Sequence, residues 1–410
     1  MYAQTKLTNG LRVVTESVPF AQSVALGIWL DVGARDEQDR EAGISHLAEH
    51  MLFKGTGRRT AQQIAEELDA VGGQLNAFTD KEYTCYYAKV LPEHVSIAVD
   101  VLADMLQNSL LDPEELERER NVVLEEIKRH EDSPEDLVHD VFAGVLWPGH
   151  PLGRPVIGRP ESVQRFTRGD LVQYLARHYR PDRLVVAAAG KLTHEEIIAL
   201  VERHFGGLTG QSSPRTSQRP DFGFGEVILS KNTEQVHFCF GTRGFDENDE
   251  DRYALGILDT AIGGGMSSRL FQEVREKRGL CYSIGSYVAS YREAGMFAIY
   301  AGTSLTHLDE VRELARQELV SVAKKGLTGD EFQRAKNQIR GGVLLGLDSM
   351  TGRMSRLGKS ILHYDRVVSP FEIVEKVESL TQNDVQRVAQ LVFGDESFAY
   401  AAVGPFNASQ

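Results

Sequence analysis

The feature that most constrains the fold of this 410-residue chain is an internal repeat. The segment LLDPEELERERNVVLEEI from Leu110 aligns without a gap with GLTGDEFQRAKNQIRGGV from Gly326, an offset of 216 residues. Each half also opens with an apolar strand pattern, SVALGIWLDVG or EQVHFCFGTRG, and ends in a similar phrase, VVAAAG or AYAAVG. Self-similarity at this spacing indicates one structural unit used twice.

The segment between the two copies, Thr209 to Pro220, is polar and rich in Ser and Pro, and it has no apolar periodicity. Such composition is typical of a linker. We therefore predict a first domain over residues 1–210, a linker over 211–220 and a homologous second domain over 221–410. Aromatic and β-branched strands in close pairs alternate with helices of moderate length, which predicts the α+β class. Each domain is expected to be an α/β sandwich, a mostly antiparallel sheet with helices packed on one face.

Charge and composition exclude several functional classes. The net charge is -14, from 59 acidic and 45 basic residues, whereas a nucleic-acid site needs a basic surface. The N-terminal sequence lacks the pattern of a signal peptide, and no apolar run is long enough to span a bilayer. Cys85, Cys239 and Cys281 lie far apart among apolar residues, which is typical of buried thiols in a reducing compartment. We expect a cytoplasmic protein that binds no nucleic acid.

The strongest chemical signal is the pentapeptide HLAEH, formed by residues 46–50. Two histidines four apart project from the same face of a helix, which suits two imidazoles on one tetrahedral zinc ion. Glu49 lies three residues after His46 and next to His50, so its carboxylate can reach a water on the same metal without coordinating it. The motif also arises by chance in a chain with 12 histidines, and paired surface histidines remain an alternative.

A third protein ligand is expected, because a catalytic zinc site takes three protein ligands and leaves one position open. The acidic helix expected from Pro113 to Glu131 offers Glu119 and Glu126, which are seven residues apart and share one face. Glu125 points about 100° away from Glu126. The competing interpretation is that these carboxylates belong to a solvated helix face.

The second repeat supports a metal-binding role for these residues in the first repeat, because it keeps the corresponding helices and lacks the candidate metal ligands. At the offset of 216, Ala335 corresponds to Glu119 and Gly342 corresponds to Glu126. Loss of the whole set from one copy is what a functional site in the other copy predicts, whereas scattered surface residues have no reason to vanish together. The residues opposite His46, Glu49 and His50 in the second half are Ile257, Thr260 and Ala261.

HLAEH, followed 76 residues after His50 by Glu126 in ERERNVVLEEI, resembles the pitrilysin family of metallopeptidases. Its nearest likeness is the branch containing the β subunit of mitochondrial processing peptidase and its bacterial relatives. The resemblance extends over nearly the whole chain. It implies one zinc ion per chain held by His46, His50 and Glu126, with Glu49 as general base and Glu119 supporting the site.

The same resemblance gives a function to two further motifs. Asn76, Ala77, Phe78 and Thr79 form a motif similar to the family's edge strand, to which a peptide substrate adds by backbone hydrogen bonds. The resemblance assigns substrate binding to Asn76, Ala77 and Phe78. Arg275 and Tyr282 match a pair that holds the substrate carbonyl and the developing oxyanion. Without the resemblance, the residues of the first motif fit an ordinary strand equally well. Those of the second motif fit an arginine on a charged helix and a tyrosine in a strand, with no shared function.

The resemblance implies a zinc-dependent endopeptidase that hydrolyses short or unfolded peptides, presequence-like ones among them, within a closed chamber. Long family members carry four repeats in one chain, whereas this chain has two, so a second copy is expected to complete a homodimer. Arg275 and Tyr282 would then act in trans. Two alternatives remain: a heterodimer with another subunit, and a non-catalytic scaffold or partner subunit of a larger complex.

Overall fold

Two β-sheets organise the chain in the computed structural model, which describes residues 2–215 and 217–406. Residue 216 of the expected linker and residues 1 and 407–410 at the ends of the expected domains lie outside the described residues. The strands of the first sheet are β1 (Tyr2–Lys6), β2 (Arg12–Ser17), β3 (Val24–Leu30), β4 (Gln74–Thr79), β5 (Thr84–Val90) and β6 (Leu184–Gly190). Those of the second sheet are β7 (Glu226–Ser230), β8 (Val236–Gly244), β9 (Cys281–Ser290), β10 (Gly295–Thr303) and β11 (Ala399–Gly404).

The two sheets have the same topology, which confirms the internal repeat. The first has the strand order β1-β2-β6-β3-β5-β4 and the second β7-β11-β8-β10-β9, so β1 is an addition to the first sheet. Each sheet has one parallel pair, β2 with β6 or β7 with β11, and its other pairs are antiparallel. The predicted α+β class with mostly antiparallel sheets is therefore confirmed. Strand β4 forms an edge of the first sheet.

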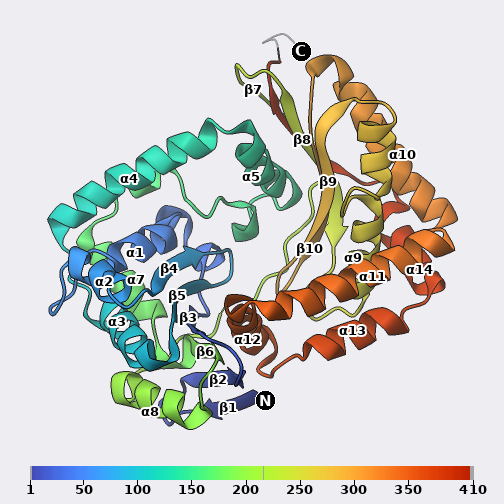
Figure 1. Cartoon of the computed structure of the whole chain (residues 1–410). Helices are drawn as coiled ribbons and strands as arrows, with labels where there is room; N and C mark the ends of the chain where they lie inside the picture. The colour runs from blue at the N-terminus through green and yellow to red at the C-terminus, as the bar shows by residue number, and fades with distance from the viewer. Residues whose placement is uncertain (1, 216, 407–410) are drawn as a thin grey trace. The chain divides into compact units, whose positions relative to one another are not determined.

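The helices divide between two compact units, one around each sheet (Figure 1). The first unit contains residues 1–127, 155–216 and 346–368, and the second contains residues 128–154, 217–345 and 369–410. Helices of the first unit are α1 (Ile44–Leu52), α2 (Ala61–Asp69), α3 (Val95–Asn108), most of α4 (Pro113–Glu131), α6 (Pro160–Val163), α7 (Arg168–His178), α8 (His194–Phe205) and α12 (Met350–Tyr364). Helices of the second unit are α5 (Pro134–Leu146), α9 (Asp251–Ile262), α10 (Leu308–Lys325), α11 (Gly329–Leu345), α13 (Pro370–Ser379) and α14 (Gln382–Phe393).

Alternation along β3 shows why the first sheet is covered on both faces. Every residue of this strand is buried. Leu26 and Ile28 join the main core formed with the helices that follow the first strands, whereas Trp29 packs on the opposite face with residues of α12. Since successive side chains of a strand point to opposite faces, a strand that is apolar throughout needs a cover on each face.

The helices that cover the second faces are exchanged between the sequence halves. Helix α12 comes from the second half of the chain and packs against β2, β3 and β6 of the first sheet. Helix α5 comes from the first half and packs against β8 and β11 of the second sheet. The two helices begin at residues 134 and 350, which differ by the repeat offset of 216, so they are equivalent elements of the two copies. The sequence predicted helices on one face of each sheet and did not reveal this exchange.

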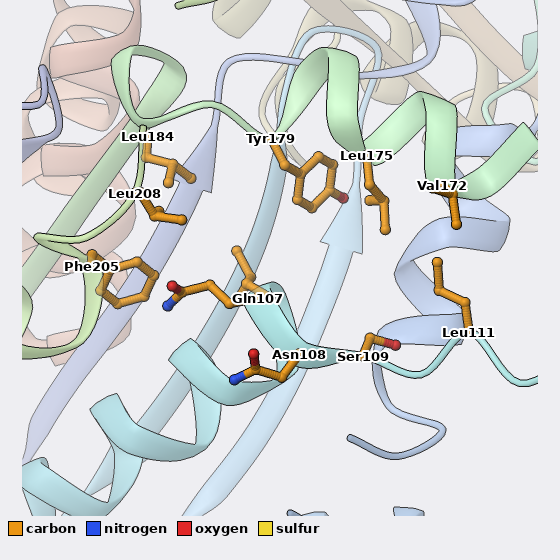
Figure 2. Close-up of a pocket in the computed structure, with 11 residues that line it drawn as sticks. Gln107, Asn108, Ser109, Leu111, Val172, Leu175, Tyr179, Leu184, Phe205 and Leu208 are labelled. Carbon is orange, nitrogen blue, oxygen red and sulfur yellow. The ribbon is translucent and has the colours of Figure 1, made fainter. Parts of the chain in front are cut away.

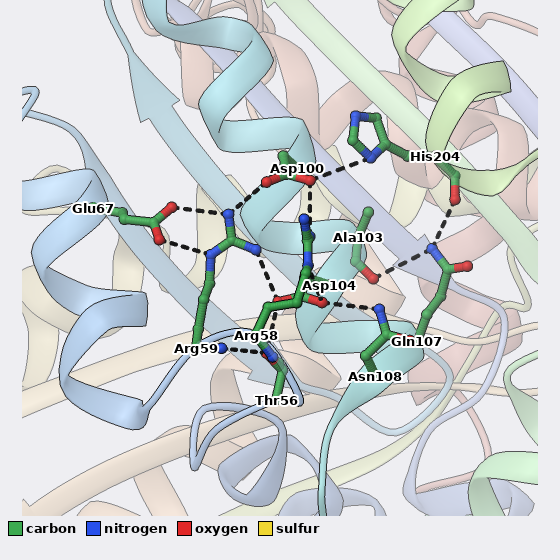
Figure 3. A network of polar contacts seen from close by, with 10 residues as sticks. All are labelled: Thr56, Arg58, Arg59, Glu67, Asp100, Ala103, Asp104, Gln107, Asn108 and His204. Atoms are coloured by element: carbon green, nitrogen blue, oxygen red, sulfur yellow. Dashed lines mark hydrogen bonds and ion pairs between the residues drawn. The ribbon is translucent and has the colours of Figure 1, made fainter.

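A buried polar network fixes the segment after α1 to helix α3 (Figure 3). The Asp104 side chain is fully buried, and its carboxylate accepts hydrogen bonds from Thr56 (2.6 Å), Arg59 (2.8 Å) and Arg58 (3.1 Å). Burial raises the pKa of Asp104, but the hydrogen bonds from its donors outweigh burial and lower that pKa to about 2. The carboxylate is therefore ionised and saturated with donors, which makes the network a structural element.

Three other sequence expectations concern the linker, membrane spans and thiols. Residues 211–215 are neither helix nor strand, and the Arg215 guanidinium lies 2.6 Å from Asp36 and 3.2 Å from Asp31. Among the described residues, no helix is both long and apolar enough to cross a membrane. All three cysteines are free; Cys85 and Cys239 are buried, and Cys281 is half-buried.

Candidate metal centre

Helix α1 carries the HLAEH pentapeptide, and its start is fixed by an unusual backbone. Gly43 precedes the helix with a φ of 93°, and a Cβ at this position would lie 2.8 Å from the Cα of Gly158. The buried Glu37 carboxylate accepts hydrogen bonds from the N–H groups of Gly43 and Ser45, both at 2.8 Å. A carboxylate at a helix N-terminus satisfies free N–H groups and complements the helix dipole. These contacts determine the position of α1.

The two histidines of α1 face the same direction. The ring centroids of His46 and His50 are 4.7 Å apart, and both side chains are mostly buried. Burial, and then the neighbouring His50 imidazole, lowers the pKa of His46 to about 4. His46 is therefore neutral at physiological pH, which is the state in which an imidazole can bind a metal ion.

Helix α4 brings a carboxylate to these histidines. Glu119 lies on the buried stripe of α4 with Leu116 and Val123, and Glu126 lies two turns further along the helix. The Glu126 Oε2 atom is 3.7 Å from Nε2 of His46 and 3.6 Å from Nε2 of His50. The structure thus brings together the three residues expected to bind zinc, and one ligand atom from each lies within 4.8 Å of the others.

A second set of contacts orients His50. The Glu119 Oε2 atom lies 3.0 Å from Nδ1 of His50, and the Glu119 Oε1 atom lies 2.6 Å from Nζ of Lys54. A proton on Nδ1 leaves the Nε2 lone pair of His50 directed toward Glu126. Nδ1 of His46, by contrast, is buried without a hydrogen-bond partner in the described part of the chain. Lys54 was not predicted as a site residue, because it lies two residues beyond the end of α1, where the helical spacing of the motif no longer applies.

Glu49 contacts the edge strand of the first sheet. The Thr79 hydroxyl donates a hydrogen bond of 2.6 Å to Oε2 of Glu49. Burial raises the pKa of Glu49, while the hydrogen bond from Thr79 and the nearby His50 act to lower it. Thr79 was predicted as the last residue of the edge-strand motif, but its contact with Glu49 was not predicted. The alternation of β4 is the signal that could have revealed it, because Leu75, Ala77 and Thr79 share one face of the strand.

The three residues expected to bind substrate lie on β4. Asn76 uses its own Oδ1 atom to accept a hydrogen bond of 2.8 Å from the N–H group of Ala77. Phe78 points to the other side, where its ring centroid is 5.6 Å from that of Trp29. The Phe78 side chain is therefore part of the packing. Its N–H and C=O groups face β5, because the Asp80 N–H two residues on donates to the Tyr83 carbonyl, so the backbone groups at the open edge are those of Ala77 and its alternate neighbours.

Arg275 and Tyr282 belong to the second unit and lie beside each other. Arg275 is in a π-helical turn, Phe271–Glu276, and Tyr282 is near the start of the edge strand β9. The guanidinium carbon of Arg275 is 4.8 Å from the ring centroid of Tyr282. Tyr282 is 77% exposed, so its phenol is accessible. The pairing expected from the sequence is thus present within this unit.

The second repeat lacks the ligand chemistry in the structure as it does in the sequence. Ala335 is buried in α11, and Gly342 lies on the same helix with open space where a side chain would be. Across residues 2–215 and 217–406, the group formed by His46, His50 and Glu126 is the only cluster of three or more His, Cys, Asp or Glu residues with metal-ligand spacing.

A separate pocket of about 420 Å³ in the first unit is lined by other residues (Figure 2). Leu111, Leu175 and Phe205 provide apolar walls, and the exposed Gln107 and Asn108 lie beside them. Its lining includes none of the residues proposed for metal or substrate binding. The candidate site therefore rests on its set of donor atoms and not on this cavity.

Comparison with family models gives two adjacent matches. Residues 12–159 match the model described as insulinase (peptidase family M16), and residues 165–339 match the model described as peptidase M16 inactive domain. The first match covers HLAEH and α4, and the second runs from residue 165, within the first half, to residue 339 of the half that lacks the ligand set. The complete ligand set thus lies within the first match.

Similar sequences and structures extend over nearly the whole chain. An uncharacterized zinc protease of Streptomyces coelicolor is 43% identical, over 99% of this chain and 90% of the relative. The uncharacterized zinc protease YmxG of Bacillus subtilis is 42% identical, over 97% of both chains. A protease from Helicobacter pylori has a similar fold, with a TM-score of 0.93, 21% identity, and coverage of 98% of this chain and 99% of that one. A structure from Pseudomonas fluorescens described as a peptidase M16 inactive domain gives a TM-score of 0.92 at 20% identity, over 100% of this chain and 99% of that one.

Proposed function

The chain belongs to peptidase family M16, the pitrilysin family, and from this premise we propose that it is a zinc-dependent endopeptidase of short or unfolded peptides. The observation that carries the proposal is the convergence of His46, His50 and Glu126 beside Glu49. Relatives at about this length are named zinc proteases, which supports the reaction class.

The donor set fits zinc. Two imidazole nitrogens and one carboxylate oxygen are ligands that zinc accepts in catalytic sites, where a fourth position stays open. Ligand atoms at roughly 2.1 Å from a tetrahedral zinc ion are about 3.4 Å apart. The distances of 3.6 Å and 3.7 Å from Glu126 to the two histidines are close to that value. His46, His50 and Glu126 would hold one zinc ion per chain.

Zinc bound there would supply Lewis acidity, polarising the scissile carbonyl and acidifying a water molecule. Glu49 then acts as general base: its carboxylate takes the proton of the attacking water and later delivers it to the leaving amine nitrogen. Burial, which raises the pKa of Glu49, suits a group that must both accept and release a proton. Glu119 contributes indirectly: its contact with Nδ1 of His50 orients the imidazole of that ligand.

The free edge of β4 supports binding of extended peptides. In an edge strand, alternate N–H and C=O groups are available to an added strand. The Ala77 N–H group is occupied by the Asn76 side chain, so an incoming peptide carbonyl would replace that contact. Backbone recognition of this kind requires a segment that can become extended, which favours short or unfolded substrates, presequence-like peptides among them.

Arg275 and Tyr282 are proposed to stabilise the oxyanion, acting from a second copy of the chain in a homodimer chamber. A guanidinium and an exposed phenol are suitable donors for charge that develops in a transition state. The test mixes two inactive variants, Glu49→Gln and Arg275→Ala. Recovery of part of the wild-type activity in the mixture supports action in trans, whereas mixtures that form dimers without recovering activity contradict it.

The decisive experiment for the function is metal content together with peptide cleavage, on the wild type and on Glu49→Gln. We expect about one zinc per chain in both proteins, chelator-sensitive cleavage of a peptide library by the wild type, and no cleavage by the variant. Glu117→Gln is the matched control, because Glu117 lies on α4 with a 67% exposed side chain paired to Arg120. A wild type without zinc and without cleavage would favour the non-catalytic scaffold.

A further inference from the structure

One hydrogen bond connects the proposed general base to the proposed substrate strand. The Thr79 Oγ1 atom donates to the Glu49 Oε2 atom at 2.6 Å, across the contact between α1 and β4. Thr79 is the last residue of β4 and pairs with Thr84 of β5. The donor is therefore held by the sheet, and the acceptor is held by the helix that carries the two histidines.

We propose that Thr79 is a positioning residue that fixes the Glu49 carboxylate relative to a peptide docked on β4. This inference rests on the proposed peptidase function and gives Thr79, predicted only as part of the edge strand, a role toward the general base. The Thr79 hydroxyl donates to the Glu49 carboxylate, so it acts through Glu49.

The geometry explains why such a link is useful. A side-chain carboxylate on a helix can rotate about several bonds, and a hydrogen bond on one oxygen restricts that rotation while the other oxygen can still accept a proton. A substrate that pairs with β4 is aligned by the backbone of residues 74–79, the same segment that ends in the Thr79 hydroxyl. The same strand therefore positions both the general base and the scissile bond. Such alignment of reacting groups affects kcat more strongly than it affects substrate affinity.

Packing supports a fixed position for the hydroxyl. Leu75 and Ala77, which share the strand face of Thr79, pack against the main core of the first unit. Phe78, on the other face, packs with Trp29, Tyr83 and Tyr87. With both faces of the strand anchored, Thr79 has little freedom to leave Glu49.

The test compares Thr79→Val, which removes the hydroxyl but keeps the shape, with Thr79→Ser, which keeps the hydroxyl. We expect Thr79→Val to lower kcat by roughly 10- to 100-fold, as loss of a hydrogen bond to a charged group would. KM and zinc content should stay within about twofold of the wild type, because docking and metal binding use other groups. Thr79→Ser should restore most of kcat.

Thr84→Val is the matched control, because Thr84 is the cross-strand neighbour and its hydroxyl donates to the backbone carbonyl of Val32. It should leave kcat unchanged. Equal kcat in Thr79→Val and wild type overturns the inference, and so does a loss of zinc or a loss of kcat that Thr79→Ser does not restore. If the wild type itself cleaves no peptide, the proposed function fails first, and the two failures are distinguished.

Discussion

Replacement of Glu119 should weaken zinc binding, and the contacts of its two oxygens allow the loss of affinity to be estimated for each substitution. Its side chain is only 8% exposed, and its two oxygens contact Nδ1 of His50 at 3.0 Å and Nζ of Lys54 at 2.6 Å. Removal of a group that orients a metal-binding histidine typically costs 10- to 100-fold in affinity, which is about 1.4–2.7 kcal/mol. Glu119→Gln retains a neutral oxygen that can accept from His50, so about tenfold is expected. Glu119→Ala removes the acceptor from both Nδ1 of His50 and Nζ of Lys54, so about 100-fold is expected.

The assay is competition for zinc between each apo protein and a chromogenic chelator at one pH and ionic strength. Thermal unfolding of the apo proteins shows that the variants are folded, so that a weaker zinc affinity is not confused with unfolding. Glu117→Gln removes an exposed carboxylate from the same helix and should bind zinc as the wild type does. Zinc dissociation constants for both Glu119 variants within about twofold of the wild type would refute the argument that Glu119 orients His50.

Three further predictions concern stability. His178 is buried beside two arginines, and burial, then Arg177 and Arg183, lower its pKa to about 3. A depressed histidine pKa means that the unfolded chain takes up the proton first, so stability falls as pH drops below about 6.5. At pH 5 this amounts to about 2 kcal/mol, which urea unfolding at pH 5 and pH 8 should show for the wild type and not for His178→Gln. Asp104→Asn should lower the free energy of unfolding, measured with urea, by about 3 kcal/mol, because the buried Asp104 carboxylate pairs with two arginines. Replacement of the half-exposed Arg58 by alanine should lower it by under about 1 kcal/mol. Zinc at about 1,000 times its dissociation constant should stabilise the wild type by about 4 kcal/mol, which calorimetry with and without chelator measures, and Glu126→Gln should lose most of that response.

Much of the candidate site could be predicted from the sequence because its signals are local. His46, Glu49 and His50 lie within one helical turn, and a spacing of four residues dictates that the histidines share a face. Glu119 was identifiable as a partner of Glu126 by the same periodicity. Lys54 was missed because it lies beyond the end of α1 and contacts Glu119 on a distant helix. Thr79 was predicted as part of the edge strand, but its contact with Glu49 was not, because that contact joins two elements that are distant in the sequence.

The sequence by itself determined the repeat, the strand and helix types, the mostly antiparallel sheets and the position of the ligand set in one copy. These features follow from periodicity and from comparison of one half with the other, which need no knowledge of packing partners. Only the tertiary structure decided that α5 and α12 cover each other's sheets. The sequence of an amphipathic helix shows that one of its faces is apolar. Because the two sheets have the same topology, either of them could accept that face, and the helix sequence alone does not determine which sheet it covers.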